Sequence, residues 1–421
     1  MECNSYWAAS FRQTQKRAEL SGEKHTDVAI IGAGFTGLSS SYFLQKSGYQ
    51  TIVLDQGPVG GGASGRNGSL MLVGYKHSLV NIANRFGVET AKEMLQISLD
   101  GIELVKSITQ EHNIECELEN NGSFYAAFKP AHFENLKREQ EFMTEKLNYE
   151  NTVVEANDIK QELDTNLYHG GLVDPNSYHF HPLKYAVGLG ELVESVGGAI
   201  YENSKVISID KKNQMFYLTT PNGKVVAKEL VIATNGYTTS ITKQLARSII
   251  PMNSNMIATE PLDETIAKKL IPKKRGAFDT KNLLYYFRLS SDNRLLFGSR
   301  IAGPQNDILY EKLRQGMLNV FPQLKESKID YKWGGKLAVT RSMFPHVGKM
   351  EDGAHFALGY SGHGVSLSTL MGQIIAENIA ASDREKCSLE KLPLKEIPFL
   401  NQRGLILNLA TNYFRLKDLI S

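Results

Sequence analysis

Cysteine is scarce in this sequence: Cys3, Cys116 and Cys387 are the only three, and they lie far apart without a CxxC pair. This scarcity argues against a disulfide framework and a thiolate metal site, and it favours a reducing, cytoplasmic setting. No apolar run approaches the roughly 20 residues that a transmembrane helix needs, and residues 1–24 are too polar for a signal peptide. We therefore expect a cytoplasmic protein without stable membrane insertion.

Excess charge of one sign is also absent, since 47 basic and 45 acidic residues leave a net charge of only +2. This balance gives no electrostatic footprint for nucleic acid, so no nucleic-acid partner is expected. The 421 residues, 42% of them hydrophobic and 22% charged, are sufficient for a full core and two globular domains.

What is present near the N-terminus is a complete strand–turn–helix–strand unit. Residues 27–31 predict a buried strand, the glycine motif of residues 32–37 follows, residues 38–48 predict a helix, and residues 51–55 predict a second strand. A GxGxxG turn lets the backbone approach a pyrophosphate at a helix N-terminus, and an acid after the second strand can bind a ribose. A glycine turn without function is the alternative, but the complete unit favours cofactor binding. The expected contacts are Gly32, Ala33, Gly34, Phe35, Thr36, Gly37, Asp55 and Gln56.

Three further segments favour FAD over NAD. Residues 61–68 form a glycine-rich loop, residues 230–236 place small residues after a buried strand, and residues 359–366 lead from a glycine turn into a helix. That helix N-terminus can stabilise negative charge on a reduced flavin, whereas an NAD-linked enzyme has no evident use for all three segments. The expected contacts here are Ala63, Ser64, Arg66, Asn67, Gly68, Ala233, Thr234, Gly236, Gly359, Gly362, His363, Gly364 and Val365.

Together, the motifs at residues 32–37, 62–68 and 361–364 resemble the D-amino-acid oxidase family of flavoenzymes, which includes glycine, sarcosine and dimethylglycine oxidising enzymes. The resemblance is closest to the gamma-glutamylputrescine oxidoreductase branch, although Ser69 stands where that branch has a second glycine. The residues that carry the branch resemblance are 5–9, 66–68, 179–183, 286–289, 321–324 and 413–418.

The resemblance implies an α/β fold (α+β overall), with a discontinuous, Rossmann-like FAD-binding domain of the glutathione-reductase type and an inserted mixed-sheet substrate domain. It also implies that main chain at Val206 holds the adenine. The expected division is residues 25–80, 150–240 and 335–400 for FAD, residues 81–149 and 241–334 for substrate, and residues 401–421 as a C-terminal helix.

Departures from the family narrow the expected chemistry. Leu337 stands near the place of an arginine that pairs with the substrate carboxylate in glycine and D-amino-acid oxidases, and Ser366 replaces a lysine of sarcosine oxidases. A buried carboxylate needs a charged partner, so an amine, or an amino acid whose carboxylate lies far from the reacting nitrogen, is favoured over a plain α-amino acid. Residues 337–340 contain no cysteine for covalent attachment, so non-covalent FAD is expected. Some oxidases of the family carry a lysine above the flavin that promotes reaction with oxygen, and Leu296 stands near the place of that lysine. The identity of the electron acceptor, oxygen or another compound, therefore stays open.

Candidate substrate contacts lie in a predicted β-hairpin, residues 283–298, where Tyr286 and Arg288 share one face. Arg288, Arg341 or Lys336 is a candidate partner for a remote carboxylate, and His363 for the flavin. Each candidate also has a structural alternative. The aromatic side chains could pack the domain interface, the arginine could form a surface ion pair, and His363 could cap a turn.

The HxH spacing of His179 and His181 resembles a metal motif, but without a third ligand a structural or helix-start role is favoured, and no metal site is expected. The predicted reaction is hydride transfer from an amine, gamma-glutamylputrescine-like or other, to FAD, giving an imine that hydrolyses to an aldehyde. Alternatives are an oxidase or dehydrogenase of glycine, sarcosine or a D-amino acid, a tRNA-modifying FAD protein, and a dehydrogenase docked to a membrane through residues 405–420.

Overall fold

The computed structural model describes residues 5–13, 16–300, 305–381 and 383–398, and within them the chain forms two large sheets. The first sheet has the order β17-β18-β11-β1-β2-β8, and its neighbours from β18 to β8 run parallel. An antiparallel extension, β9 and β10, pairs with β11, and β17 is antiparallel to β18. The strands are β1 (Gly22–Ile31), β2 (Thr51–Leu54), β8 (Ala199–Tyr201), β9 (Ser208–Lys212), β10 (Met215–Thr219), β11 (Gly223–Ile232), β17 (His346–Lys349) and β18 (His355–Leu358).

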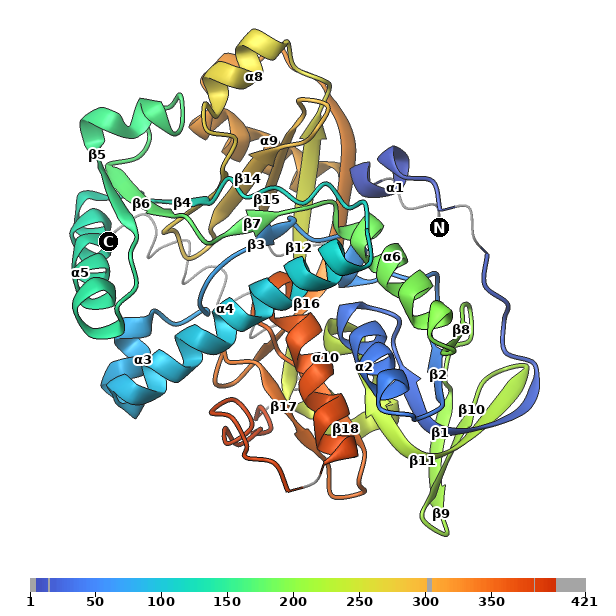
Figure 1. Cartoon of the computed structure of the whole chain (residues 1–421). Helices are drawn as coiled ribbons and strands as arrows, with labels where there is room; N and C mark the ends of the chain where they lie inside the picture. Colours follow the sequence, from blue (N-terminus) through green and yellow to red (C-terminus); the bar gives the residue numbers. More distant parts are fainter. Residues whose placement is uncertain (1–4, 14–15, 301–304, 382, 399–421) are drawn as a thin grey trace.

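One face of the first sheet is covered by α2 (Phe35–Lys46), α6 (Pro182–Ser195) and α10 (Gly364–Ala380), and α4 (Val88–Glu111) packs on α10 (Figure 1). Helix α2 can approach α10 closely because three consecutive serines, residues 39–41, are fully buried and small. Apolar side chains from β1, α2 and α10 form one core there, for example Ile30, Leu38 and Ile375. This packing fixes the glycine turn between β1 and α2.

The second sheet is mixed and has the order β16-β12-β15-β14-β13-β4-β6-β5, with β13 and β4 parallel and the other pairs antiparallel. Helix α9 packs on β12 and β15, and α5 packs on β5 and β6. The strands are β4 (Ser123–Ala126), β5 (Thr152–Glu155), β6 (Gly170–Asp174), β12 (Ile249–Thr259), β13 (Gly276–Asp279), β14 (Tyr285–Leu289), β15 (Leu295–Ser299) and β16 (Ile329–Thr340). The remaining elements are α1 (Tyr6–Ser10), α3 (Leu79–Phe86), α5 (Pro130–Leu147), α7 (Lys243–Arg247), α8 (Glu264–Leu270), α9 (Asp307–Val320) and the strand pair β3 (Leu70–Met71) with β7 (Tyr178–His179).

The predicted mixed α/β architecture and the hairpin at residues 283–298 are confirmed. Residues 223–232 form one strand that pairs with β1 along its whole length, and the small residues expected after a buried strand follow it at residues 233–236. Residues 152–155 and 170–174, which the expected division assigns to FAD, pair in the second sheet; the division into domains itself stays a prediction. The expected C-terminal helix and the amphipathic stretch at residues 405–420 lie outside the described residues. Among the described helices, none is both long and apolar enough to cross a bilayer.

Candidate active site

The three motif segments are tied together by side-chain hydrogen bonds. The hydroxyl Oγ of Ser64 accepts a hydrogen bond from the backbone N–H of Phe35 at 3.0 Å, which joins the 61–68 loop to the start of α2. The hydroxyls of Thr36 and Tyr360 lie 2.6 Å apart, which joins α2 to the turn before α10. Segments that are distant in sequence therefore form one cradle at the ends of parallel strands, where α/β sheets bind ligands.

Three glycines of the first motif have no room for a side chain. A Cβ on Gly32, whose φ is +111°, would lie 2.8 Å from the carbonyl oxygen of Ala233. A Cβ on Gly34 would lie 2.7 Å from Ser64 Oγ, and one on Gly37 would lie 1.9 Å from the carbonyl oxygen of Gly32. The turn thus needs glycine at all three positions, as close approach of backbone to a pyrophosphate requires.

Asp55 supports the same turn from the end of β2. Its Oδ2 accepts a hydrogen bond from the N–H of Ala33 at 2.7 Å, and its Oδ1 accepts one from the N–H of Gly57 at 2.9 Å. Burial raises the pKa of Asp55 and the charge of Glu202 acts in the same direction, while these N–H groups oppose both. The carboxylate therefore holds the turn and also lines the cavity beside Gln56.

The two tryptophans of the chain both hold the 61–68 loop. Trp7 Nε1 donates to the carbonyl oxygen of Asn67 at 2.9 Å, and Trp333 Nε1 donates to that of Arg66 at 3.1 Å. The side chain of Asn67 also accepts a hydrogen bond from the N–H of Ser69 at 2.7 Å. Asn67 thus shapes the loop as well as lining the cavity, which its predicted role as a cofactor contact did not include.

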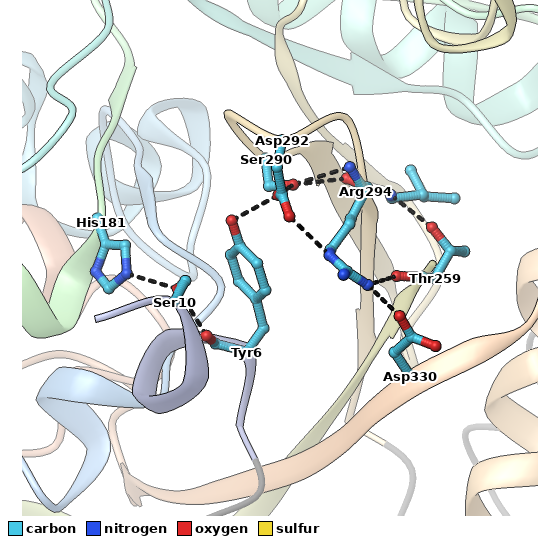
Figure 2. A network of polar contacts seen from close by, with 9 residues as sticks. Tyr6, Ser10, His181, Thr259, Ser290, Asp292, Arg294 and Asp330 are labelled. Carbon is cyan, nitrogen blue, oxygen red and sulfur yellow. Dashed lines mark hydrogen bonds and ion pairs between the residues drawn. The ribbon is translucent and has the colours of Figure 1, made fainter. Parts of the chain in front are cut away.

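The N-terminal helix α1 is anchored to both halves of the molecule (Figure 2). Tyr6 donates from its hydroxyl to Asp292 Oδ1 at 2.7 Å, and Asp292 in turn accepts from Arg294 Nε at 2.8 Å. Ser10 Oγ lies 3.1 Å from Nε2 of His181 at the start of α6. Burial and the bond to Asp292 raise the pKa of Tyr6 to about 12, so the hydroxyl remains a donor. These contacts anchor α1 to the β14–β15 turn and to the start of α6.

A cavity of about 1080 Å³ extends along the cradle, which is large for a ligand site and leaves room for substrate beside a dinucleotide. Most of the predicted cofactor contacts line it: Gly32, Gly34, Phe35, Thr36, Asp55, Gln56, Ala63, Ser64, Arg66, Asn67, Gly68, Val206, Ala233, Thr234, Gly362, His363, Gly364 and Val365.

Four predicted contacts lie behind the lining instead: Ala33, Gly37, Gly236 and Gly359. Their positions are set by neighbouring backbone. A Cβ on Gly236, for instance, would lie 2.6 Å from the carbonyl oxygen of Lys336, and Gly359, with φ +79°, donates its N–H to Asn235 Oδ1 at 3.0 Å. Asn235 lines the cavity and was not among the predicted contacts.

The floor of the cavity beyond the 61–68 loop is a row of side chains across four strands of the second sheet. Tyr286 pairs with Phe278, Phe278 with Tyr125, and Tyr125 with Leu172, and all four line the cavity. Paired residues point to one face, so at about 4.8 Å per strand the row spans roughly 14 Å. The rings of Tyr125 and Phe278 are stacked, with centroids 4.4 Å apart.

Tyr286 joins this row to the cofactor cradle. A Cβ on Gly68 would lie 2.5 Å from its ring, and one on Gly298 would lie 2.2 Å from it, so the ring fills space that both glycines leave open. Its hydroxyl lies 2.8 Å from Ser254 Oγ. Tyr286 therefore lines the cavity, and its role as a substrate contact stays a prediction.

Neither Arg288 nor Arg341, both candidate substrate contacts, lines the cavity within the described residues. Arg288 is two residues farther along β14 than Tyr286, about 7 Å, and is buried outside the lining. Its Nη1 lies 2.9 Å from His179 Nδ1, and its guanidinium lies over the Trp7 ring. Arg341 is exposed on the turn after β16 and does not line the cavity either.

The two histidines of the HxH motif have structural roles. His181 is the N-cap of α6, and its Nδ1 accepts a hydrogen bond from the N–H of Lys184 at 3.2 Å, which confirms the predicted helix-start role. His179 Nε2 lies 3.1 Å from the carbonyl oxygen of Lys274. Within the described residues, no group of three potential ligands is placed to bind a metal.

Positive charge gathers where the turn before α10 meets the cavity. Burial lowers the pKa of His363 to about 3, and Arg300 and Lys76 add to this effect, so the imidazole is neutral. His363 Nδ1 is buried and has no hydrogen-bond partner among the described residues. Arg300, which the sequence did not single out, lines the cavity at the end of β15 and donates from Nη2 to the carbonyl oxygen of Ser361 at 3.2 Å.

Negative charge gathers at the opposite end of the row. Glu139 and Met143, one turn apart on α5, line the cavity there together with Asn151 and Asp174. Burial raises the pKa of Glu139 to about 7 against a hydrogen bond from the N–H of Leu79.

The positions that depart from the family can also be located. Leu337 lines the cavity, so its wall is apolar at that point. Ser366 is fully buried and donates back to the carbonyl oxygen of His363, and Leu296 is buried in the cluster around Trp7 and Trp333.

A glycine turn after β1, a second loop against it and an uncapped helix N-terminus opposite define the cradle of an FAD-dependent oxidoreductase. The pattern of the family described as FAD dependent oxidoreductase (DAO) matches residues 27–378, and the chain belongs to this family. It is 34% identical over 423 residues to "Probable oxidoreductase OrdL" of Haemophilus influenzae, with 98% of this chain and 97% of that protein covered. It is 32% identical over 421 residues to gamma-glutamylputrescine oxidoreductase of Escherichia coli, with 99% and 98% covered.

The crystal structure of glycine oxidase from Geobacillus kaustophilus has the same fold, with a TM-score of 0.74 at 18% identity, covering 88% of this chain and 98% of that one. The predictions of family, fold class, FAD and an enzyme acting on C–N groups of amines or amino acids are therefore confirmed. The cradle also fits FAD by its own geometry. Its glycines exclude a Cβ, the N-termini of α2 and α10 lack side-chain caps, and His363 Nδ1 is buried without a partner among the described residues.

Proposed function

We propose that the chain oxidises a C–N bond of an elongated amine, gamma-glutamylputrescine-like in shape, to an imine that hydrolyses to an aldehyde. The observation that carries this proposal is the row from Tyr286 to Leu172, which continues the cavity about 14 Å away from the cofactor cradle. Glycine or sarcosine would leave most of this floor uncovered. The gamma-glutamylputrescine oxidoreductase relative supports the same substrate class.

The residues that would hold FAD without a covalent bond are the predicted contacts that line the cavity. Gly32, Gly34 and the N–H groups at the start of α2 would bind the pyrophosphate, Asp55 the ribose, and His363 with the N-terminus of α10 the flavin ring. When bound, FAD supplies the acceptor for the hydride that leaves the carbon next to nitrogen.

The chain's own contribution is to position the substrate and keep its reacting nitrogen neutral. Arg300 and Lys76 place positive charge at the cradle end of the cavity, and a neighbouring cation disfavours the ammonium form of an amine. Tyr286 covers the junction between the loop and the floor, where it limits access of water. The neutral His363 offers a ring nitrogen for a hydrogen bond without adding charge.

Oxidation of a small amino acid is the second candidate, and Arg300 is the observation that favours it. Its guanidinium lines the cavity and, within the described residues, forms no ion pair with an acidic side chain. A substrate carboxylate would therefore complement its charge. Against this candidate, Leu337 makes the wall apolar near the place where the resemblance implies an anchoring arginine.

Anaerobic bleaching of the flavin separates the two candidates without assuming an acceptor. Gamma-glutamylputrescine, diamines and monoamines are compared with glycine, sarcosine and D-amino acids, and the reduction rate is followed at the flavin absorbance. We expect rapid reduction by the elongated amines and slow reduction by the amino acids. Reduction by the amino acids alone would overturn the proposal. The electron acceptor, oxygen or another compound, and a cytoplasmic location stay predictions.

A further inference from the structure

The cavity has opposite charge at its two ends. Arg300 and Lys76 lie near His363 at the cradle end, since both lower the pKa of that imidazole. Glu139 lines the cavity from α5, the helix that packs on β5 and β6, and its charge acts on Tyr125, whereas that of Arg300 acts on Tyr286. Within the described residues, Glu139 has no ion-pair partner. The positive end would repel an ammonium group and favour a neutral amine, because like charges repel. The end with Glu139 would favour the ammonium form, because a buried carboxylate requires a cation.

The surroundings of Glu139 contain further acceptors for a donor-bearing group. Met143, one helical turn from Glu139, accepts a contact from Asn151 Nδ2 at 3.5 Å, which brings the Asn151 amide to the same end of the cavity. Asn151 Oδ1 is buried and has no hydrogen-bond partner among the described residues. Asp174 lines the same end, although Tyr149 already donates to its carboxylate at 2.9 Å.

The floor that connects the two ends is apolar and aromatic. Tyr125 and Phe278 are stacked along it, and neither presents an ionised group, because burial raises the pKa of the Tyr125 hydroxyl well above its ordinary value. A methylene chain laid on this floor would bury apolar surface, and aromatic faces also attract cations.

From this geometry we infer that Glu139, with the Asn151 amide oxygen, forms a subsite for an ammonium group at the far end of the substrate. The inference rests on the proposed function and deepens it. The substrate class is an amine that carries a second, cationic nitrogen across an apolar spacer. Glu139 binds that nitrogen as ammonium, whereas the positive end keeps the reacting nitrogen neutral. The charge distribution thereby determines which nitrogen of the molecule is oxidised.

Two matched pairs of amines test this subsite: 1,4-diaminobutane against butylamine, and gamma-glutamylputrescine against glutarylputrescine, which lacks its distal ammonium. Anaerobic flavin reduction gives a half-saturating concentration and a limiting rate for each. In the wild type, the member with the distal ammonium should have a half-saturating concentration at least tenfold lower in at least one pair. An equal value for both members of both pairs would overturn the inference without any variant.

Glu139→Gln should remove the preference, raising the half-saturating concentration of the dicationic member at least tenfold while the limiting rate changes less than threefold. The member without the distal ammonium should change less than twofold. Glu139→Asp keeps the charge and should restore part of the preference, and it serves as the test if Glu139→Gln does not fold. Glu141→Gln is the matched control, because Glu141 is exposed on the same helix and does not line the cavity.

The failures of the two proposals are distinguishable. If no amine of either pair reduces the flavin while glycine or a D-amino acid does, the proposed function fails. If amines reduce the flavin and Glu139→Gln retains the wild-type preference, only the ammonium subsite fails.

Discussion

Replacing Trp7 by phenylalanine tests whether the indole contacts control the affinity for FAD. The change removes the N–H that donates to the carbonyl oxygen of Asn67 at 2.9 Å, in the loop that lines the cofactor cradle. It keeps an aromatic ring at a fully buried position, next to His181 and beneath Arg288. The loss is therefore mainly that of one hydrogen bond rather than of the packing.

The expected magnitude follows from that hydrogen bond. A typical bond contributes about 0.5–1.5 kcal/mol net, and a buried carbonyl left without its donor costs about 1–3 kcal/mol. If about 1–2 kcal/mol of this is lost from the FAD-bound loop, the dissociation constant of FAD rises about 5- to 30-fold. Trp333→Phe, which removes the donor to Arg66 at 3.1 Å, should have a comparable effect.

The assay is titration of the apoprotein with FAD, followed by the quenching of flavin fluorescence. Tyr6→Phe is the control, because it removes a hydrogen bond from the same helix, to Asp292 at 2.7 Å, without touching the loop. It should lower the thermal midpoint while leaving the dissociation constant of FAD within twofold. The reasoning is refuted if Trp7→Phe binds FAD as tightly as the wild type while losing as much thermal stability as Tyr6→Phe.

Three other outcomes are expected. Ser69→Gly should raise the free energy of unfolding by ~1 kcal/mol in chemical denaturation, because Ser69 has φ +66° and a buried hydroxyl without a partner among the described residues; an unchanged or lower value would contradict this. Acid precipitation should leave yellow FAD in the supernatant, since neither Cys116 nor Cys387 lines the cavity, and a yellow pellet would show a covalent bond. Burial raises the pKa of Glu139 from 4.5 to about 7, so its protonated form stabilises the apoprotein at low pH, and that stability is lost as the pH rises through about 7. Glu139→Gln should flatten this part of the pH–stability curve. A curve identical to that of the wild type would show that the Glu139 carboxyl is exposed to solvent.

The local parts of the fold were predictable because short segments determine them. The strands predicted at residues 27–31 and 51–55 end within one residue of β1 and β2, since compact apolar runs beside glycine-rich turns leave little choice of boundary. The glycine turn of residues 32–37 was equally clear, because its conformation and close contacts permit only glycine at three positions.

The substrate end of the site was not predictable, because it depends on pairing between segments far apart in sequence. Alternation within β14 correctly placed Tyr286 and Arg288 on one face, but it could not show that this face leaves the cavity within two residues. Glu139 and Arg300 carry no motif, and α5 and β15 bring them to opposite ends of one cavity only through the order of the second sheet. Trp7 was missed although it had a signal, since it is one of only two tryptophans and belongs to the 5–9 segment of the family resemblance.

The separation of cofactor and substrate functions between the two sheets has a consequence for specificity. FAD-binding residues lie on turns of the first sheet and on the 61–68 loop, whereas the row from Tyr286 to Leu172 belongs to the second sheet. Each strand of that sheet adds one side chain and about 4.8 Å to the floor. A substitution at Phe278 or Tyr125 would therefore shorten or block the floor without disturbing the cradle. Tyr286 is the exception, because its ring packs against Gly68 of the loop, so changes there should alter FAD affinity and substrate selection together.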